Sequence, residues 1–147
     1  MAQNNDALWG GRFASGPDGA LAALSKSTHF DWRLAQYDLK GTAAHLKALH
    51  AANYLTDEEL AVLDKAVAEL SKRVSSGAFL PKADEEDVHA ALERGLIEIA
   101  GSEIAGKVRA GRSRNDQIAT LVRSFMLDAA DEVEKQILGY LDALCTQ

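Results

Sequence analysis

Residues 113–147 read SRNDQIATLVRSFMLDAADEVEKQILGYLDALCTQ. Apolar side chains in this stretch recur every three or four residues, which is the period of one face of an α-helix. These positions are Ile118, Leu121, Val122, Phe125, Val133, Ile137, Leu141 and Leu144. Ser113 and Asp116 have the spacing of a capping box, so the pattern predicts one helix that begins near Ser113 and continues for roughly ten turns.

The predicted long helix has no stop signal. The last residues, 145–147, contain neither a glycine cap nor a proline, so we expect the chain to end inside a helix and to be an N-terminal fragment of a longer protein. A helix much longer than the average of about 12 residues cannot cover its own apolar stripe. We therefore expect two units: residues 1–112 form a small helical N-terminal domain, and residues 113–147 begin a second, truncated one.

Shorter helices are predicted upstream. Residues 1–17 carry turn chemistry and are expected to form an irregular arm. Asp18 can cap a short helix through Leu24, and after a polar linker Asp31 can cap a longer one. The expected apolar face of that longer helix consists of Leu34, Tyr37, Ala44, Ala48 and Ala52.

Two further helices follow, and the first is the clearest in the chain. Thr56 and Glu59 have capping-box spacing, and Gly77 is expected to end the helix that they begin. Its apolar positions are Leu60, Leu63, Val67, Leu70 and Val74. The acidic run 84–87 suits the first turn of another helix, which reaches about Ala100. Residues 101–111 are expected to form a loop, with Gly106 as a second helix breaker.

Composition narrows the class of protein. The chain has 147 residues, of which 47% are hydrophobic, and a formal net charge of −6. Two prolines and few β-branched runs favour an all-α fold. The single Cys145 cannot form an internal disulfide, and we find no signal peptide and no segment long enough to span a bilayer. We expect a cytoplasmic protein that binds neither membranes nor nucleic acid.

A cationic cluster stands out against this acidic background. Residues 107–114 contain Lys107, Arg109, Arg112 and Arg114 and no acid. A guanidinium grips a carboxylate with two parallel hydrogen bonds, and the N-terminus of a helix adds further donors. The cluster therefore predicts a site for a small acidic metabolite. Because Arg112 and Arg114 flank Ser113, we expect their side chains to point in different directions, with Arg114 and Asn115 facing the ligand. The alternative to a ligand site is a basic turn that is solvated or that pairs with acids at an interface.

Other polar residues have plainer interpretations. Ser27 and Asp31 lie four residues apart, which places them on one side of a helix, but a linker serine and an N-cap aspartate need no ligand. His89 is most simply a packed histidine, and Asp87 part of a favourable first turn. The four histidines show no metal-ligand spacing, so no metal is predicted. No G-x-S-x-G nucleophile motif is present.

Four ordered blocks of sequence resemble the argininosuccinate lyases of the fumarase/aspartase superfamily. The first block is Leu8-Trp9-Gly10-Gly11-Arg12-Phe13, and the second runs from Ser27 to Asp31 with Arg33, Leu34 and Asp38. The third block is Glu86-Asp87-Val88-His89, and the fourth is Gly111-Arg112-Ser113-Arg114-Asn115-Asp116-Gln117. One departure is clear: most members have His-Thr where this chain has Arg109-Ala110.

The resemblance implies a fold and a chemistry. Residues 113–147 would be the first long helix of a helical-bundle domain, and the full-length protein would be a homotetramer. The implied activity is the reversible β-elimination of argininosuccinate to arginine and fumarate, in arginine biosynthesis and without a cofactor. The resemblance places Ser27, Asp31, Arg114 and Asn115 at substrate-contacting positions. Supporting roles fall to Arg112, Ser113, Asp87 and His89.

No catalytic residue is expected within this chain, apart from a minor hypothesis for His89. The family's base and acid are a serine in a flexible glycine-rich loop and a histidine in a Thr-His-Leu-Gln motif, and neither has a counterpart here. Other superfamily lyases, such as adenylosuccinate lyase or fumarase, are disfavoured by the Trp-Gly-Gly-Arg-Phe start. A non-catalytic helical assembly module, of the kind that lens crystallins of this family illustrate, is the alternative from a different class.

Overall fold

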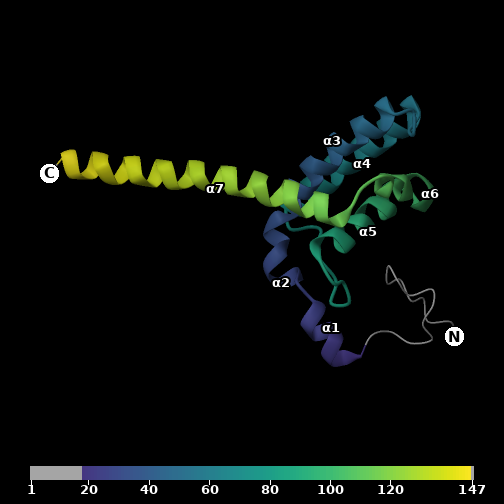
Figure 1. The fold of residues 1–147 in the computed structure, drawn as a ribbon, viewed down its shortest axis with the longest axis horizontal. Helices are drawn as coiled ribbons and strands as arrows, with labels where there is room; N and C mark the ends of the chain where they lie inside the picture. Colours follow the sequence, from purple (N-terminus) through teal and green to yellow (C-terminus); the bar gives the residue numbers. More distant parts are fainter. Residues whose placement is uncertain (1–17, 147) are drawn as a thin grey trace.

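The computed structural model describes residues 18–146, and this part of the chain contains helices and turns but no strand (Figure 1). The predicted all-α class is therefore confirmed. In chain order the elements are α1 (Gly19–Ser25), α2 (Thr28–Asp31), η2 (Trp32–Leu34), α3 (Ala35–Ala51), α4 (Asp57–Ser75), α5 (Val88–Ala100), α6 (Ser102–Ala105), η3 (Gly106–Arg109) and α7 (Arg114–Cys145). The expected N-terminal arm, with Trp9 and Phe13, lies outside the described residues.

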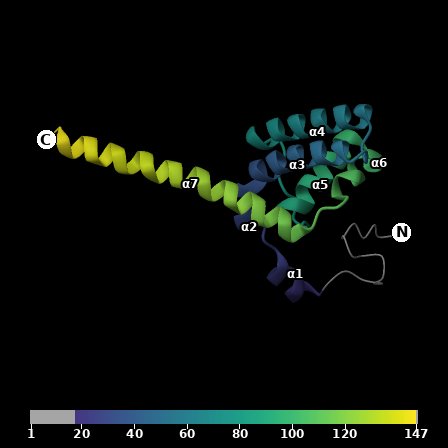
Figure 2. The same cartoon turned by 45° about the horizontal axis from the view of Figure 1, so that its top comes forward.

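The core lies between α3, α4 and α5, which we call the helical body. Helices α3 and α4 lie side by side as a hairpin, and α5 packs against both (Figure 2). The largest apolar side chains that are fully buried are Leu46 from α3, Leu63 and Leu70 from α4, and Val88 from α5. Phe79, in the loop between α4 and α5, closes one end of this core beneath the guanidinium of Arg94, which lies 4.4 Å from its ring centre.

Helix α4 has the predicted start, face and end. The Thr56 hydroxyl accepts a hydrogen bond from the N–H of Glu59, and the Glu59 carboxylate accepts one from the N–H of Thr56. This reciprocal pair satisfies two donors that the first turn of a helix leaves unpaired. After the helix, Gly77 has a φ of 73°, a conformation that glycine adopts without a steric penalty.

The predicted face of α3 was wrong. Ala44, Ala48 and Ala52 are exposed, and the helix instead buries a neighbouring stripe. That stripe consists of Ala35, Asp38, Leu39, Thr42, Leu46 and Leu49. Leucine removes far more apolar area from water than alanine does, so the leucine positions decide which side faces the core. The helix also begins later than expected, because residues 28–34 form the short turns α2 and η2.

Two other boundaries differ from expectation. Helix α5 begins at Val88, so the acids 84–86 precede it and only Asp87 acts on its first turn, accepting from the N–H of Ala90 at 2.7 Å. Residues 102–109 form the short helices α6 and η3 rather than a loop. Gly106 has helical backbone angles and does not break the chain there.

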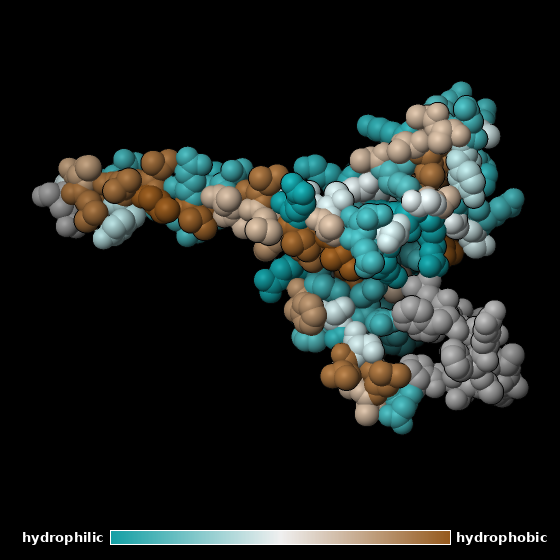
Figure 3. All heavy atoms as spheres, viewed as in Figure 1, coloured by the Kyte–Doolittle hydropathy of each residue, from teal (hydrophilic) through white to brown (hydrophobic). Residues whose placement is uncertain are grey.

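Helix α7 has the predicted length and remains largely uncovered. It contains 32 residues, and the Ser113 hydroxyl caps it by accepting from the N–H of Asn115, not from Asp116 as the capping-box spacing suggested. Only Leu121 is buried. Beyond the helical body, residues 130–145, here called the α7 arm, project alone and are exposed throughout (Figure 1). The arm carries a line of apolar side chains on its surface (Figure 3).

Among the described residues, no helix is long and apolar enough to cross a membrane. The division of the chain at residue 112 remains a prediction. The first three turns of α7 pack against α3, so the two expected units share one contact surface.

Candidate functional site

The carboxylate of Asp38 is the centre of a buried polar cluster. Asp38 lies on the core-facing side of α3 and is 2% exposed. One oxygen, Oδ2, accepts a hydrogen bond from Nδ1 of His89 at 2.6 Å. The other, Oδ1, accepts from Nε2 of Gln117 at 2.6 Å and from Nη2 of Arg112 at 3.2 Å. A carboxylate can only accept, so the three donors from α5, α7 and the turn before α7 fix its charged state.

These donors decide the ionisation of Asp38. Burial by itself raises the pKa of a carboxyl group, because the charged form loses its hydration. Here the hydrogen bonds from His89 and Gln117 and the charges of His89 and Arg112 outweigh burial, and the pKa of Asp38 lies below its ordinary value. Asp38 is therefore an anion at neutral pH, held at the point where three helices meet.

Arg112 is one of the cations that surround Asp38. Its side chain is 14% exposed, and Nη1 donates to the hydroxyl of Thr42 at 2.8 Å. Burial lowers the pKa of Arg112, and the charge of Asp38 opposes that change. The guanidinium lies 3.6 Å from the position that a Cβ on Gly41 would occupy, in ordinary van der Waals contact.

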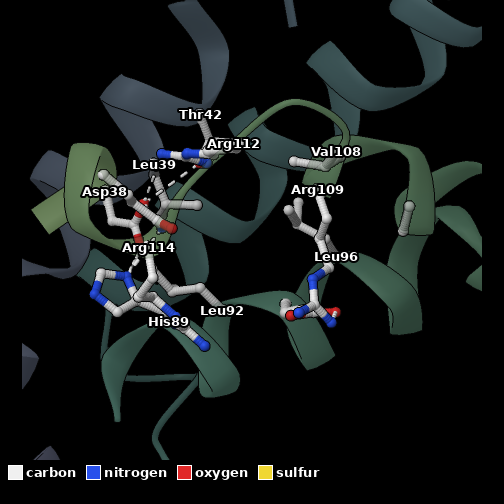
Figure 4. A pocket seen from close by; sticks show the side chains of 13 residues that line it. Asp38, Leu39, Thr42, His89, Leu92, Leu96, Val108, Arg109, Arg112 and Arg114 are labelled. Atoms are coloured by element: carbon white, nitrogen blue, oxygen red, sulfur yellow. Dashed lines mark hydrogen bonds and ion pairs between the residues drawn. The ribbon is translucent and has the colours of Figure 1, made fainter. Parts of the chain in front are cut away.

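Arg114 lies on the other side of Ser113 and contacts a different carboxylate. Its Nη1 donates to Oδ1 of Asp87 at 3.3 Å, the same oxygen that caps α5. Arg112 and Arg114 nevertheless line one cavity of about 100 Å³, together with Asp38 and His89 (Figure 4). The two side chains point apart, as expected, and contact different carboxylates, but contrary to expectation both contribute to the lining of one cavity.

Ser27 and Asp31 lie beyond Asp87, outside this cavity. The Ser27 hydroxyl donates to Oδ2 of Asp31 at 2.6 Å, so their predicted proximity is confirmed. The side chain of Asp31 does not cap the helical turn that follows it; instead Oδ2 accepts from the N–H of Val88, the first residue of α5, at 3.2 Å. Oδ1 of Asp31 is buried and has no hydrogen-bond partner among the described residues.

The predicted substrate residues therefore lie around the start of α5 without converging on one cavity. Ser27 and Asp31 contact the chain at Val88, and Arg114 contacts it one residue earlier, at Asp87. Asn115 is exposed on the first turn of α7. The arrangement forms a polar strip with carboxylate acceptors at one end and cationic and amide donors at the other.

Every cation of the predicted cluster is paired with a carboxylate from another element. Lys107 pairs with Glu59 of α4 at 2.6 Å, and Arg109 with Glu93 of α5 at 3.2 Å. Arg112 and Arg114 pair with Asp38 and Asp87 as described above. Interface pairing, the alternative interpretation, thus accounts for much of the cluster. Arg114 is partly exposed and its bond to Asp87 is long, so it can exchange Asp87 for a ligand with little loss of internal contacts.

The family blocks included Asp38 and Gln117 without assigning either an individual role, and Thr42 was not singled out. A charged residue within the leucine-bearing stripe of α3 was the available signal, because carboxylates are rarely buried unless they are paired. Their partners lie up to 79 residues away in sequence, so no local pattern could name them.

Two other histidines, His45 and His50, make polar contacts within the fold. Nε2 of His45 lies 3.0 Å from the carbonyl oxygen of Ala110, and Nε2 of His50 lies 2.7 Å from the carboxylate of Asp57. Within residues 18–146, no group of three or more histidine, cysteine or acidic side chains is arranged to hold a metal ion.

Comparison with known proteins defines the class. The sequence pattern of a family described as lyase matches residues 11–147, and the chain belongs to this lyase family. Among the similar curated proteins is the argininosuccinate lyase of Mycobacteroides abscessus, 54% identical over 147 residues, which are 100% of this chain and 31% of that protein. The argininosuccinate lyase of Thermobifida fusca is 56% identical over 140 residues, 95% of this chain and 29% of that protein. The argininosuccinate lyase of Leifsonia xyli is 57% identical over the same share of this chain and 30% of its own length. The chain thus spans about 30% of the length of these relatives.

Proposed function

We propose that this chain supplies the N-terminal, substrate-binding part of an argininosuccinate lyase. The observation that carries the proposal is identity of 54–57% to enzymes of that name over nearly all of the chain. The reaction is the reversible β-elimination of argininosuccinate to arginine and fumarate. A base removes a proton next to a carboxylate, the C–N bond breaks, and an acid protonates the departing guanidino nitrogen.

The polar strip suits the two ends of this substrate. Negative charge develops on a carboxylate during proton removal, and Arg114 with Asn115 at the N-terminus of α7 offers cationic and neutral donors for it. Asp31, oriented by the Ser27 hydroxyl, offers an anion for the guanidino or amino group. Oδ1 of Asp31 supports this role, because a buried carboxylate oxygen without a donor is unfavourable until a ligand supplies one.

The supporting residues hold these groups in place. Asp87 contacts both Arg114 and the first turn of α5, and Ser113 caps the turn that carries Arg114 and Asn115. Arg112 and His89 act on the same turn through Asp38. None of them is assigned a proton-transfer step, which the resemblance places in sequence beyond this chain.

The 147-residue chain by itself is expected to lack lyase activity. Binding without the base and the acid forfeits about 10²–10⁴-fold for each proton transfer. Fumarate release, followed by ultraviolet absorbance with the chain as the only protein, checks this expectation. Turnover comparable to that of an intact relative would show that the proton-transfer groups lie within these residues.

In the full-length enzyme, Arg114→Lys and Asn115→Leu are expected to lower both kcat and kcat/KM, by an amount corresponding to about 1.5–3 kcal/mol for a lost charge-assisted bond. Lysine keeps the charge but loses the guanidinium fork, whereas leucine keeps bulk and loses both polar functions. Arg123→Lys, on the exposed side of α7, is the matched control. Steady-state kinetics with thermal melts tests the pair; near-parental turnover, or lost activity with a collapsed Tm, would return both residues to a structural role.

We also propose that the full-length protein is a cytoplasmic homotetramer in which the α7 arm is buried in a bundle of long helices. The exposed stripe of the arm supports this proposal, since apolar surface of that length is rarely left in water. The isolated chain should then self-associate or keep a mobile C-terminal region. Sedimentation combined with amide exchange tests this, and a monomer with strong protection from Gln117 to Leu144 would contradict it.

A further inference from the structure

The Asp38 cluster has no part in the proposed substrate contacts, yet it is the most completely buried ionic arrangement in the described chain. Asp38 is almost fully enclosed by protein, with 2% of its surface exposed. Placing a charge there is unfavourable unless several donors compensate for lost hydration. The geometry supplies them from distant parts of the chain: His89 from α5, Gln117 from α7 and Arg112 from the turn before α7.

Two of these donors lie on either side of the turn that begins α7. Arg112 precedes the capping residue Ser113, and Gln117 follows it by one helical turn. Both contact the same carboxylate oxygen, Oδ1 of Asp38. Oδ1 of Asp38 thus contacts one side chain before and one side chain after Arg114 and Asn115.

Farther along, α7 contacts α3 and η2, and the pKa of Tyr37 is raised by its hydrogen bond to Asp128 of α7. Leu121 is buried, and the ring of Phe125 meets the ring of Tyr37 edge-on at 5.8 Å. From residue 130 onward the side chains are exposed and make no contact that could direct the helix. The direction of this 32-residue helix is therefore decided by contacts made before the α7 arm begins at residue 130.

We propose that Asp38 is a positioning residue that sets the direction of α7 and, with it, the placement of Arg114 and Asn115 relative to Asp31 and Asp87. The role of those four residues in substrate binding rests on the proposed function, whereas the direction of α7 does not. Because α7 rises about 1.5 Å per residue, a swing of about 10° at Ser113 displaces residue 131 by about 5 Å. A small change at Asp38 thus becomes a large displacement in the arm.

Asp38→Asn is the direct test, since asparagine keeps the shape and removes the charge. Its amide nitrogen would face a donor, either His89 or Gln117, and leave buried groups unpaired. Gln117→Leu is the second variant; it removes the contact from α7 but leaves Asp38 paired with His89 and Arg112, so folding is retained. Arg123→Gln, an exposed change on α7, is the matched control.

The measurement is a distance distribution by pulsed electron paramagnetic resonance on the 147-residue chain. In a Cys145→Ser background, nitroxide labels are attached at Lys65→Cys on α4 and Asp131→Cys on α7, both exposed. Labelled chain is diluted with excess unlabelled chain, so that only intramolecular pairs contribute. Far-UV circular dichroism verifies that each variant keeps its helices.

The parent and Arg123→Gln are expected to give the same distribution, whose width includes any motion of the uncovered arm. Asp38→Asn and Gln117→Leu should shift its centre by several ångströms or make it about twice as broad. If Asp38→Asn fails to fold, Gln117→Leu decides alone. The proposal is overturned if the distance distribution of the parent is already as broad as those of the variants, or if folded variants leave the distribution unchanged. It is also overturned if Leu121→Ala broadens the distribution whereas Asp38→Asn and Gln117→Leu do not. None of these outcomes depends on lyase activity.

Discussion

The helical body and the α7 arm have the same kind of apolar periodicity but opposite surroundings. In the body, Leu63 of α4 is completely buried, whereas Leu138 in the arm is 53% exposed. Both residues sit on amphipathic helices that begin with a side-chain cap. The difference shows that an apolar stripe indicates which side of a helix needs to be covered. What covers the stripe of the arm is not among the described residues.

The comparison predicts a large difference between matched leucine truncations. Leu63→Ala should lower the free energy of unfolding of the isolated chain by about 2–5 kcal/mol, because it removes apolar contacts and leaves a cavity. Leu138→Ala should change it by less than about 0.5 kcal/mol. Urea unfolding followed by tryptophan fluorescence measures both, since Trp32 packs against Phe79 at the edge of the core. Equal losses would mean that the arm is already covered in the isolated chain.

A pair of glycines sharpens the same contrast. A Cβ on Gly95 would lie 2.7 Å from Cδ1 of Leu70 and 2.8 Å from Cζ of Phe79, whereas a Cβ on Gly139 meets nothing within 4 Å. Gly95→Ala should lower the free energy of unfolding of the body by about 1–3 kcal/mol, because the added methyl group overpacks the core. The higher helix propensity of alanine offsets part of this loss.

Gly139→Ala should instead stabilise the helix of the arm, because alanine in a helix is favoured over glycine by about 0.5–1 kcal/mol, and should raise the helical content of the arm. Thermal melts and far-UV circular dichroism of the two variants provide the test. A stabilised Gly95→Ala protein would show that Leu70 and Phe79 have room to move, contrary to the tight core described above.

Lowering the pH should weaken the junction between body and arm, and we expect this loss of stability to be smaller than the effects of the leucine and glycine substitutions. The pKa of Asp38 is lower in the folded chain than its ordinary value of 3.8. Its ionised form therefore stabilises the fold above that value, and this contribution is lost as pH falls through the lower, folded pKa. The stability difference between the parent and Asp38→Asn should shrink there, by at most about 1.4 kcal/mol per pH unit. Urea titrations at several pH values measure it, and Leu63→Ala is the control whose deficit should stay constant.

Local sequence was sufficient for most helices and for several of their ends. The capping box at Thr56, the cap at Ser113 and the glycine after α4 all depend on residues within three or four positions of one another. The buried face of α3 was mispredicted because alanine and leucine were given equal weight, although their contributions to burial differ several-fold. The start of α5 was predicted too early. The Glu85 carboxylate accepts hydrogen bonds from Arg94 and from the N–H of Lys82, and none from the first turn of α5.

The candidate site was predicted less completely than the fold. The sequence singled out Arg112, Arg114 and Asn115 by their chemistry, and family resemblance added Ser27 and Asp31. The sequence allowed pairing of these cations as an alternative, but it did not indicate which carboxylate each cation would contact. The sequence also did not indicate that Arg112 and Arg114 both line one cavity. Such pairings depend on how helices cross, which composition and spacing do not specify.

The sequence by itself therefore determined the helices, the uncovered stripe of α7 and membership in the lyase family, because each of these follows from short-range periodicity or from ordered motifs. Only the tertiary structure decided which charges meet. Arg112 and Asp38 are 74 residues apart, and Gln117 and Asp38 are 79 apart. A buried carboxylate is stable only where packing brings enough donors to it, and helix packing, rather than any local pattern, put those donors around Asp38.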